Sequence, residues 1–197
     1  MQPFTKHTGL VAVMDRANVD TDQIIPAEYL KRIERAGFGP FLFAEWRKDP
    51  NFVINDPRYA GASIMIAGEN FGSGSSREHA VWALEDAGFR TVIAPSFADI
   101  FRNNCSKIGV LPVELAQESV RALMDAVLDD PTTEITVDLH ALRVSAPAVH
   151  EAFEIDPYTR WRLLEGLDDI DLTLRHANEI DAYERDRPAR LPSVPRA

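Results

Sequence analysis

The sequence of 197 residues contains one cysteine, Cys105, so it cannot form an internal disulfide. With a single thiol, no cysteine-based zinc or iron–sulfur site can be built from this chain alone. Its five histidines are scattered, with no H-x-x-H or H-E-x-x-H pair among them. We therefore interpret them as ordinary surface or core histidines, and we expect no metal or other cofactor to be bound by this chain.

The sequence also lacks any run approaching the ~20 apolar residues that a membrane-spanning helix needs. Its first residues, MQPFTKHTGLVAVM, contain no apolar stretch long enough for a secretory signal peptide. A net charge of −10 argues against wrapping nucleic acid or lying on an anionic membrane. These absences together predict a cytoplasmic protein that binds neither nucleic acid nor membranes.

What remains is an ordinary globular composition, with 45% hydrophobic and 26% charged residues. The length suits one domain with a sizeable core. The end of the chain, RDRPARLPSVPRA, is charged and proline-rich and shows no apolar period. We expect a single domain over residues 1–184 and a disordered tail over residues 185–197.

Residues 68–87, GENFGSGSSREHAVWALEDA, form the stretch around which the chain is organised. An apolar run at 63–67 precedes them and reads as a buried strand. Apolar residues at helical spacing follow, and Gly88 stands where a helix usually stops. Ser75 and Glu78 have the S-x-x-E spacing of a capping box. The pattern predicts a strand, a glycine-rich turn and a helix over about 75–87 with Ser75 as its N-cap.

Such a helix opening suits an anion, because it presents free backbone N–H groups and the positive end of the helix dipole. Gly72 and Gly74 permit positive φ and a close approach to the backbone, and Arg77 adds a fork for a carboxylate or phosphate. The plainer alternative, a capped helix with an exposed arginine, is equally compatible with the spacing. The glycines match neither a Walker loop nor G-x-G-x-x-G, so a small carboxylate is at least as plausible as a nucleotide.

Short apolar runs at 9–14, 91–94 and 109–113 predict further strands. Between the last two runs we expect a helix capped by Ser96, with one apolar face formed by Phe97, Ile100, Phe101, Cys105 and Ile108. On that face Cys105 is a buried apolar residue rather than a reactive thiol. An amphipathic helix at 117–128 should cover the sheet. Strands and helices alternating over 63–113 give a parallel βαβαβ unit, whose ligands bind beyond the carboxyl ends of the strands.

Outside this unit, the Asx- and Thr-rich residues 18–26 predict a structured loop, and Pro26 begins a short helical piece. The aromatic-rich segment 37–46 is either a packed loop or a partner-facing surface. Residues 134–139 and 143–145 should form a hairpin, followed by helices at 158–167 and 170–183. The predicted fold class is α/β, with a parallel βαβαβ core, an additional antiparallel hairpin or sheet layer, and flanking helices.

Three motifs then identify a family: D-T-D-Q-I-I-P at 20–26, G-S-G-S-S-R-E-H-A at 72–80, and S-F-A-D-I-F at 96–101 with N-N-C at 103–105. Together they resemble the swivelling domain of the aconitase superfamily. The resemblance is closer to the free-standing small subunits of bacterial isopropylmalate dehydratases, and it runs from about residue 4 to residue 183. Only the proline-rich tail departs from the family pattern.

The resemblance implies a hydro-lyase of leucine biosynthesis that interconverts 2-isopropylmalate and 3-isopropylmalate by removing and re-adding water. It implies a partner, the large subunit, whose [4Fe–4S] cluster binds the small hydroxy-dicarboxylate substrate, while this chain closes over the site. Two alternatives stay open: a related hydratase acting on citraconate or homoaconitate, and a non-catalytic anion-binding module.

Carried over by position, the resemblance makes Ser75 the base that takes a proton from the carbon next to a carboxylate. Arg77 holds a substrate carboxylate, and Ser76 orients the substrate or the base. Asp22 is an active-site aspartate of the D-T-D loop. The remaining positions implied to contact substrate are Gly74 in the glycine turn and, where family members differ by substrate, Lys31 and Arg32. We also expect Ser73 or Ser76 to take part of the helix capping, because Ser75 must face the ligand.

Overall fold

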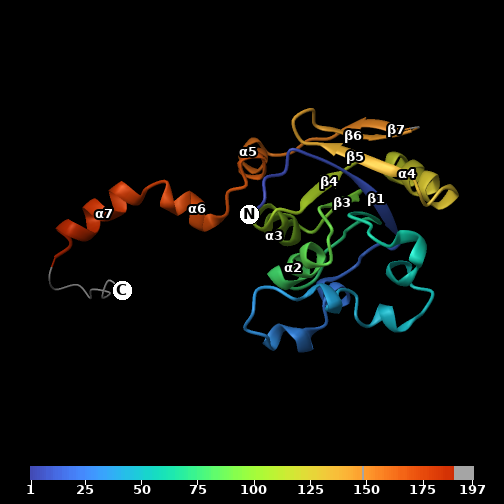
Figure 1. The fold of residues 1–197 in the computed structure, drawn as a ribbon, viewed down its shortest axis with the longest axis horizontal. Coiled ribbons are helices and arrows are strands. Elements are labelled where there is room, and N and C mark those ends of the chain that lie inside the picture. Colours follow the sequence, from blue (N-terminus) through green and yellow to red (C-terminus); the bar gives the residue numbers. More distant parts are fainter. Residues whose placement is uncertain (148, 189–197) are drawn as a thin grey trace.

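The computed structural model describes residues 1–147 and 149–188 (Figure 1). Its strands form one seven-stranded sheet in the order β4-β3-β2-β1-β5-β6-β7. Strands β1 to β4 run parallel to their neighbours, whereas β5, β6 and β7 continue the sheet from β1 in antiparallel pairing. The strands are β1 (Lys6–Met14), β2 (Ile64–Ala67), β3 (Thr91–Ala94), β4 (Leu111–Glu114), β5 (Glu134–Asp138), β6 (Arg143–Ala146) and β7 (Val149–Ala152).

Helices cover both faces of the sheet. Figure 1 shows α2 and α3 together on one side and α4 on the other, where α4 contacts β1, β2 and β3. The α-helices are α1 (Thr21–Ile24), α2 (Glu78–Asp86), α3 (Asp99–Ile108), α4 (Gln117–Asp129), α5 (Pro157–Glu165), α6 (Asp169–Leu174) and α7 (Ala177–Asp186). The 3₁₀ helices are η1 (Ala27–Lys31), η2 (Gly39–Phe41), η3 (Trp46–Lys48), η4 (Val53–Asn55) and η5 (Pro57–Tyr59).

The central strands are buried on both faces, which is the usual situation of parallel strands between helices. Every residue of β2 (IMIA) and of β3 (TVIA) is buried, so these runs are continuously apolar rather than alternating. The predicted βαβαβ unit is confirmed, and so is the 134–139/143–145 hairpin. β7, which the sequence pattern did not predict, adds a third antiparallel strand to that hairpin.

The aromatic-rich segment is packed against the body, which supports the first of its two interpretations. Phe38 and Phe43 are fully buried. Phe43 stacks on Trp46 with ring centroids 5.5 Å apart, and Phe38 contacts the α2 residue Trp82. The segment from η1 to η5 therefore forms a cap of short turns held to the body by aromatic side chains.

The start of α3 differs from the prediction. Its N-cap is Ala98, and no side chain caps it, because the Ser96 hydroxyl instead accepts a hydrogen bond from the Asn70 amide at 2.9 Å. The predicted apolar face is buried at Phe101 and Cys105, but Ile100 is 49% exposed, so its inclusion was wrong.

Beyond α5 the chain leaves the body as an arm formed by α6 and α7 (Figure 1). We predicted one helix over 170–183, but the chain bends at His176 and makes two. Neither helix buries a residue. Helix α7 includes Arg185 and Asp186, the first residues of the predicted tail, and residues 189–197 of that tail lie outside the described residues. No helix in the described ranges has the length and apolar content needed to cross a membrane.

Candidate functional site at the carboxyl edge of the parallel strands

Three loops meet at one edge of the sheet. Met14 pairs with Ala67 at the ends of β1 and β2, and β3 ends in register with β4. The loops that follow β1, β2 and β3 therefore leave the sheet at the same edge, where ligands of parallel α/β sheets bind. These loops carry the three motifs found in the sequence.

The D-T-D loop docks directly onto the glycine-rich turn. The Thr21 amide donates a hydrogen bond to the Ser73 carbonyl at 2.9 Å, and the Gly72 amide donates to the Val19 carbonyl at 2.8 Å. The Thr21 hydroxyl donates to the Ser75 carbonyl at 3.0 Å. Thr21 is buried, so these bonds hold the two motifs together as one unit shielded from water.

Helix α1 fixes the direction of the D-T-D loop although it has only four residues. The Asp20 carboxylate accepts a hydrogen bond from the Gln23 amide at 2.8 Å, and the Gln23 side chain accepts one from the Asp20 amide at 2.9 Å. This is a complete capping box. As a result Thr21 faces inward and Asp22 faces solvent.

Two glycines shape the turn. Gly72 has φ +77°, and a Cβ there would come within 2.1 Å of the Phe101 ring, so the turn lies directly on α3. Gly74 has φ +88° and is exposed. The left-handed conformation favours glycine at both positions, and at Gly74 it leaves the backbone open to an approaching ligand.

The predicted Ser75 cap was wrong. Helix α2 begins at Glu78, its N-cap is Arg77, and no side chain caps it, which also removes the capping expected from Ser73 or Ser76. At this point the Thr21 hydroxyl binds the Ser75 carbonyl, and the backbone is still extended at Arg77, so the helix begins only at Glu78. The first amides of α2 therefore keep their hydrogen-bonding capacity.

Ser75 and Ser76 are exposed on this turn. Within the described residues neither hydroxyl has a hydrogen-bond partner, so both are free to meet a ligand. Beside them the Arg77 guanidinium forms an ion pair with the Asp22 carboxylate. The Arg77 side chain is 16% exposed and that of Asp22 is 53% exposed, so the guanidinium is held at the surface by a carboxylate that water still reaches.

Lys31 and Arg32 lie at the end of η1. The Arg32 guanidinium stands over the Phe41 ring at 5.2 Å and the Phe38 ring at 5.7 Å. Phe38 packs edge-on against His79 of α2 at 5.4 Å, which ties the end of η1 to the helix that follows the serines. Burial lowers the pKa of His79 below its ordinary value. Lys31 is exposed and contacts no charged partner in the described part of the chain.

The third motif, S-F-A-D-I-F at 96–101, is hydrogen-bonded to Phe71 at the start of the glycine-rich turn. The Phe71 amide donates a hydrogen bond to the Ser96 carbonyl at 3.1 Å, and the Ala98 amide donates to the Phe71 carbonyl at 3.0 Å. Cys105 is fully buried, and burial raises the pKa of its thiol well above the ordinary value. Among the described residues, no three His, Cys, Asp or Glu side chains come close enough together to hold a metal ion.

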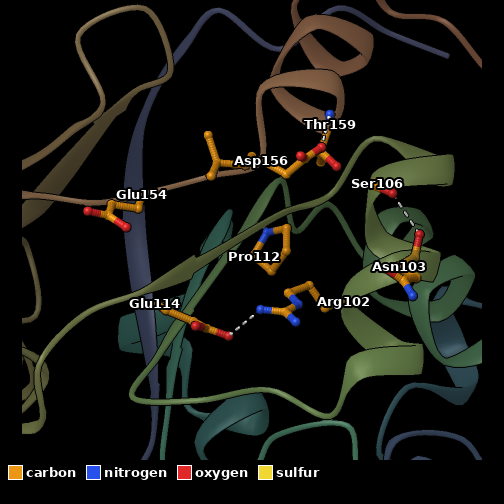
Figure 2. A pocket seen from close by; sticks show the side chains of 9 residues that line it. Arg102, Asn103, Ser106, Pro112, Glu114, Glu154, Asp156 and Thr159 are labelled. Atoms are coloured by element: carbon orange, nitrogen blue, oxygen red, sulfur yellow. Dashed lines mark hydrogen bonds and ion pairs between the residues drawn. The ribbon is translucent and has the colours of Figure 1, made fainter.

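A cavity of about 600 Å³ lies along the outer edge strand β4, between α3 and the start of α5 (Figure 2). Of its charged groups, Arg102, Glu114 and Asp156 are already engaged within the chain, and Glu154 adds a carboxylate rather than a group that would bind an anion. Arg102 pairs with Asp99 at 2.8 Å and with Glu114 at 3.3 Å. Asp156 accepts a hydrogen bond from the Thr159 amide at 2.8 Å, and this bond lowers the pKa of its carboxyl. We therefore assign this cavity no part in the edge site.

Sequence reasoning missed the contribution of Thr21. The only available signal was its place between two aspartates of the D-T-D motif. Its partner carbonyl lies 54 residues further along the chain, a separation over which a local pattern carries no information.

The fold and this edge site define the class: an aconitase-type α/β domain. The sequence matches the family model of the aconitase C-terminal domain over residues 1–118. It also matches the model described as LeuD_N over residues 121–157, and over residues 169–194 it matches the model of the C-terminal domain of the 3-isopropylmalate dehydratase small subunit.

Individual relatives show which family of aconitase-type proteins the chain resembles. The chain is 59% identical to a 3-isopropylmalate dehydratase small subunit of Rubrobacter xylanophilus, covering 98% of this chain and 100% of that protein. It is 61% identical to one from Acidothermus cellulolyticus, covering 98% of each. A crystal structure of a 3-isopropylmalate dehydratase from Methanocaldococcus jannaschii superimposes with a TM-score of 0.67 at 26% identity, covering 90% of this chain and 99% of that one. The chain belongs to the family of 3-isopropylmalate dehydratase small subunits.

Proposed function

We propose that this chain is the small subunit of a heteromeric hydro-lyase of leucine biosynthesis, which interconverts 2-isopropylmalate and 3-isopropylmalate in the cytoplasm. Its partner is a large subunit that carries a [4Fe–4S] cluster. The family membership supports the activity, and the site geometry supports the division of labour between the two subunits.

The observation that carries the proposal is a half-built pocket. Two free serine hydroxyls face solvent beside a partly buried guanidinium, on a turn whose other side is rigidly packed. A site that removes water from a hydroxy acid also needs a group to take the leaving hydroxyl. We infer that a second polypeptide supplies that group, and membership in a family of small subunits supports this inference.

In the proposed reaction Ser75 takes the proton from the carbon next to a substrate carboxylate. A serine hydroxyl is a weak base, so the site has to stabilise the alkoxide form and the charge that develops on the carboxylate. The uncapped amides at the start of α2 and the Arg77 guanidinium are preorganised donors for both charges. Removing one such donor typically costs about 3–4 kcal/mol of transition-state stabilisation.

Arg77 is proposed to hold the carboxylate with its planar fork. Asp22 orients that fork, and because Asp22 is half exposed, an incoming carboxylate can share the guanidinium with it at low cost. Ser76 and the open backbone at Gly74 are proposed to contact the substrate beside Ser75. Lys31 and Arg32 are proposed to face the part of the substrate that differs among related acids.

The residues present fit a cluster held by the partner, because the turn offers serine hydroxyls and a guanidinium to the part of the substrate that carries the carboxylate. When bound in the large subunit, the cluster supplies a Lewis acid for the hydroxyl group. This chain's own residues position the carboxylate and hold the proton at the Ser75 oxygen.

The test is reconstitution with a separately purified large subunit. The full chain alone should show no hydration of isopropylmaleate, and the mixture should restore turnover at a fixed stoichiometry. Citraconate and homoaconitate assayed in parallel measure substrate preference. Activity of the chain alone, or a mixture that stays inactive while both subunits are folded and the cluster is intact, would refute the proposal.

A further inference from the structure

A second cavity, of about 240 Å³, lies under the cap. It is bounded by Ile54 and Tyr59 from the cap, by Ala12 of β1 and by Phe89 after α2. Gly61 and Ala62, which also line it, precede β2 and so lie toward the amino-terminal end of that strand. The Ser75 turn follows the carboxyl-terminal end of the same strand, which makes this cavity separate from the edge site.

One charged side chain lines this cavity, and it has no counter-ion. The Nε atom of Arg47 is inaccessible to water and has no hydrogen-bond partner. Throughout the described part of the chain, no carboxylate pairs with the Arg47 guanidinium. Two basic residues near it in the cap differ, since Lys48 pairs with Glu45 at 2.7 Å and Arg58 pairs with Asp56 at 2.6 Å.

An unpaired guanidinium with a buried N–H is unfavourable, because the group loses hydration without gaining a partner. The backbone nevertheless holds Arg47 in place. Its amide donates to the Phe43 carbonyl at 2.8 Å, and its carbonyl accepts from the Asn55 side chain at 2.8 Å. The fold thus keeps a free guanidinium beside a cavity, and an anion bound there would supply the missing partner.

The lining restricts which anion fits. A guanidinium fork matches a carboxylate bidentately. The other side chains that line the cavity are aliphatic or aromatic, with the Tyr59 hydroxyl as their one polar group. At about 240 Å³ the cavity is below the ~300–1,000 Å³ of sites for drug-sized ligands. A small carboxylate with a short aliphatic group meets all three conditions.

We propose that the cavity under the cap is a second anion site, in which Arg47 binds the carboxylate of a short-chain aliphatic acid. This inference is independent of the proposed hydro-lyase activity, because it uses no residue of the edge site.

The test is calorimetric titration of the full-length chain with 3-methylbutanoate, with inorganic phosphate as a second probe. We expect saturable binding of one equivalent of 3-methylbutanoate, with a dissociation constant of about 1 mM, and weaker binding of phosphate. Arg47→Met should weaken binding at least tenfold. Lys48→Met, which removes a neighbouring charge that has its own partner, is the matched control and should bind like the wild type.

A second variant keeps the guanidinium in place. Ala60 is an exposed residue at the cavity, and Ala60→Leu should block entry while the protein stays folded. The proposal predicts loss of binding in this variant as well. Absence of saturable binding to the wild type, equal affinity in Arg47→Met, or loss of binding only in Arg77→Met would overturn the proposal.

Discussion

The turn between β2 and α2 has a buried side and an exposed side that differ in kind. On the buried side Gly72 packs against Phe101, and backbone hydrogen bonds join the turn to Val19 and Thr21. On the exposed side the hydroxyls of Ser75 and Ser76 make no hydrogen bond to any residue that the structure describes. Residues with no proposed chemical role, on the buried side, therefore fix the position of the serines and of Arg77. Changes on the two sides should therefore separate stability from turnover.

Replacing Ser75 should produce the largest change in activity. Ser75→Ala removes the proposed base, so kcat of the reconstituted enzyme should fall by at least about 10³-fold. The midpoint of thermal unfolding should stay within about 1 °C of the wild type, because the hydroxyl is exposed and makes no hydrogen bond to the residues that the structure describes. Steady-state kinetics and calorimetry measure the two quantities, and a near-wild-type kcat would remove Ser75 from the mechanism.

Replacing Gly72 should show the opposite pattern. Gly72→Ala places a Cβ within 2.1 Å of Phe101 and forces alanine to a positive φ. Together these effects should lower the free energy of unfolding by about 3 kcal/mol, equivalent to about 6–12 °C in the midpoint. Gly88→Ala is the matched control, because Gly88 has a positive φ but no atom within 4 Å of its Cβ position. Equal losses in the two variants would show that contact with Phe101 is unimportant.

Arg77→Lys tests whether carboxylate binding needs the planar shape of the guanidinium or only its positive charge. Lysine keeps the positive charge but cannot form a planar two-pronged contact, so kcat/KM should fall about tenfold or more through both a higher KM and a lower kcat. Arg102→Lys, in the cavity along β4, is the control and should leave kcat/KM unchanged. The carboxylate-binding role is wrong if Arg77→Lys behaves like that control.

Asp22→Asn should have a small effect on stability and a moderate one on substrate binding. The ion pair with Arg77 is half exposed on the Asp22 side, so its loss should change the free energy of unfolding by less than about 1 kcal/mol. KM should rise severalfold because the guanidinium is no longer oriented. Chemical denaturation and kinetics distinguish these effects. A large loss of stability would show that Asp22 stabilises the fold, as the residues on the buried side of the turn do.

The smallest effect concerns pH. Burial lowers the pKa of His79, so the folded state favours the neutral imidazole. Its contribution to stability is complete above the unfolded pKa of about 6.5 and is lost as pH falls through the lower folded pKa. The unfolding midpoint should therefore drop between pH 7.5 and pH 5, and His79→Gln should reduce that drop. An identical drop in the variant would assign the pH dependence to other groups.

Elements fixed by local apolar patterns were predictable from the sequence. The buried strands β2 and β3 and the amphipathic helix α4 lie where their spacing placed them. The errors have non-local causes. Ser75 does not cap α2, and its carbonyl instead accepts a hydrogen bond from the Thr21 hydroxyl. Ser96 does not cap α3, because its hydroxyl accepts a hydrogen bond from the Asn70 amide.

The site was only partly accessible to the same reasoning. Spacing pointed to Arg77, and the family resemblance selected Ser75, Ser76 and Asp22; the structure places Asp22 against Arg77 beside the two serines. The ion pair between Asp22 and Arg77 joins residues 55 positions apart and could not be read from either motif. The unpaired guanidinium of Arg47 could not be predicted either, since local sequence does not show which basic residues lack a carboxylate partner.

The most direct test of the half-pocket is amide hydrogen exchange on this chain, measured alone and then with the large subunit and a substrate-like inhibitor. Amides of residues 74–77 and of the D-T-D loop should exchange more slowly in the complex, while those around residues 53–62 should exchange at the same rate. Unchanged exchange at residues 74–77 in a fully assembled, inhibited complex would contradict the claim that this edge forms one side of the active site.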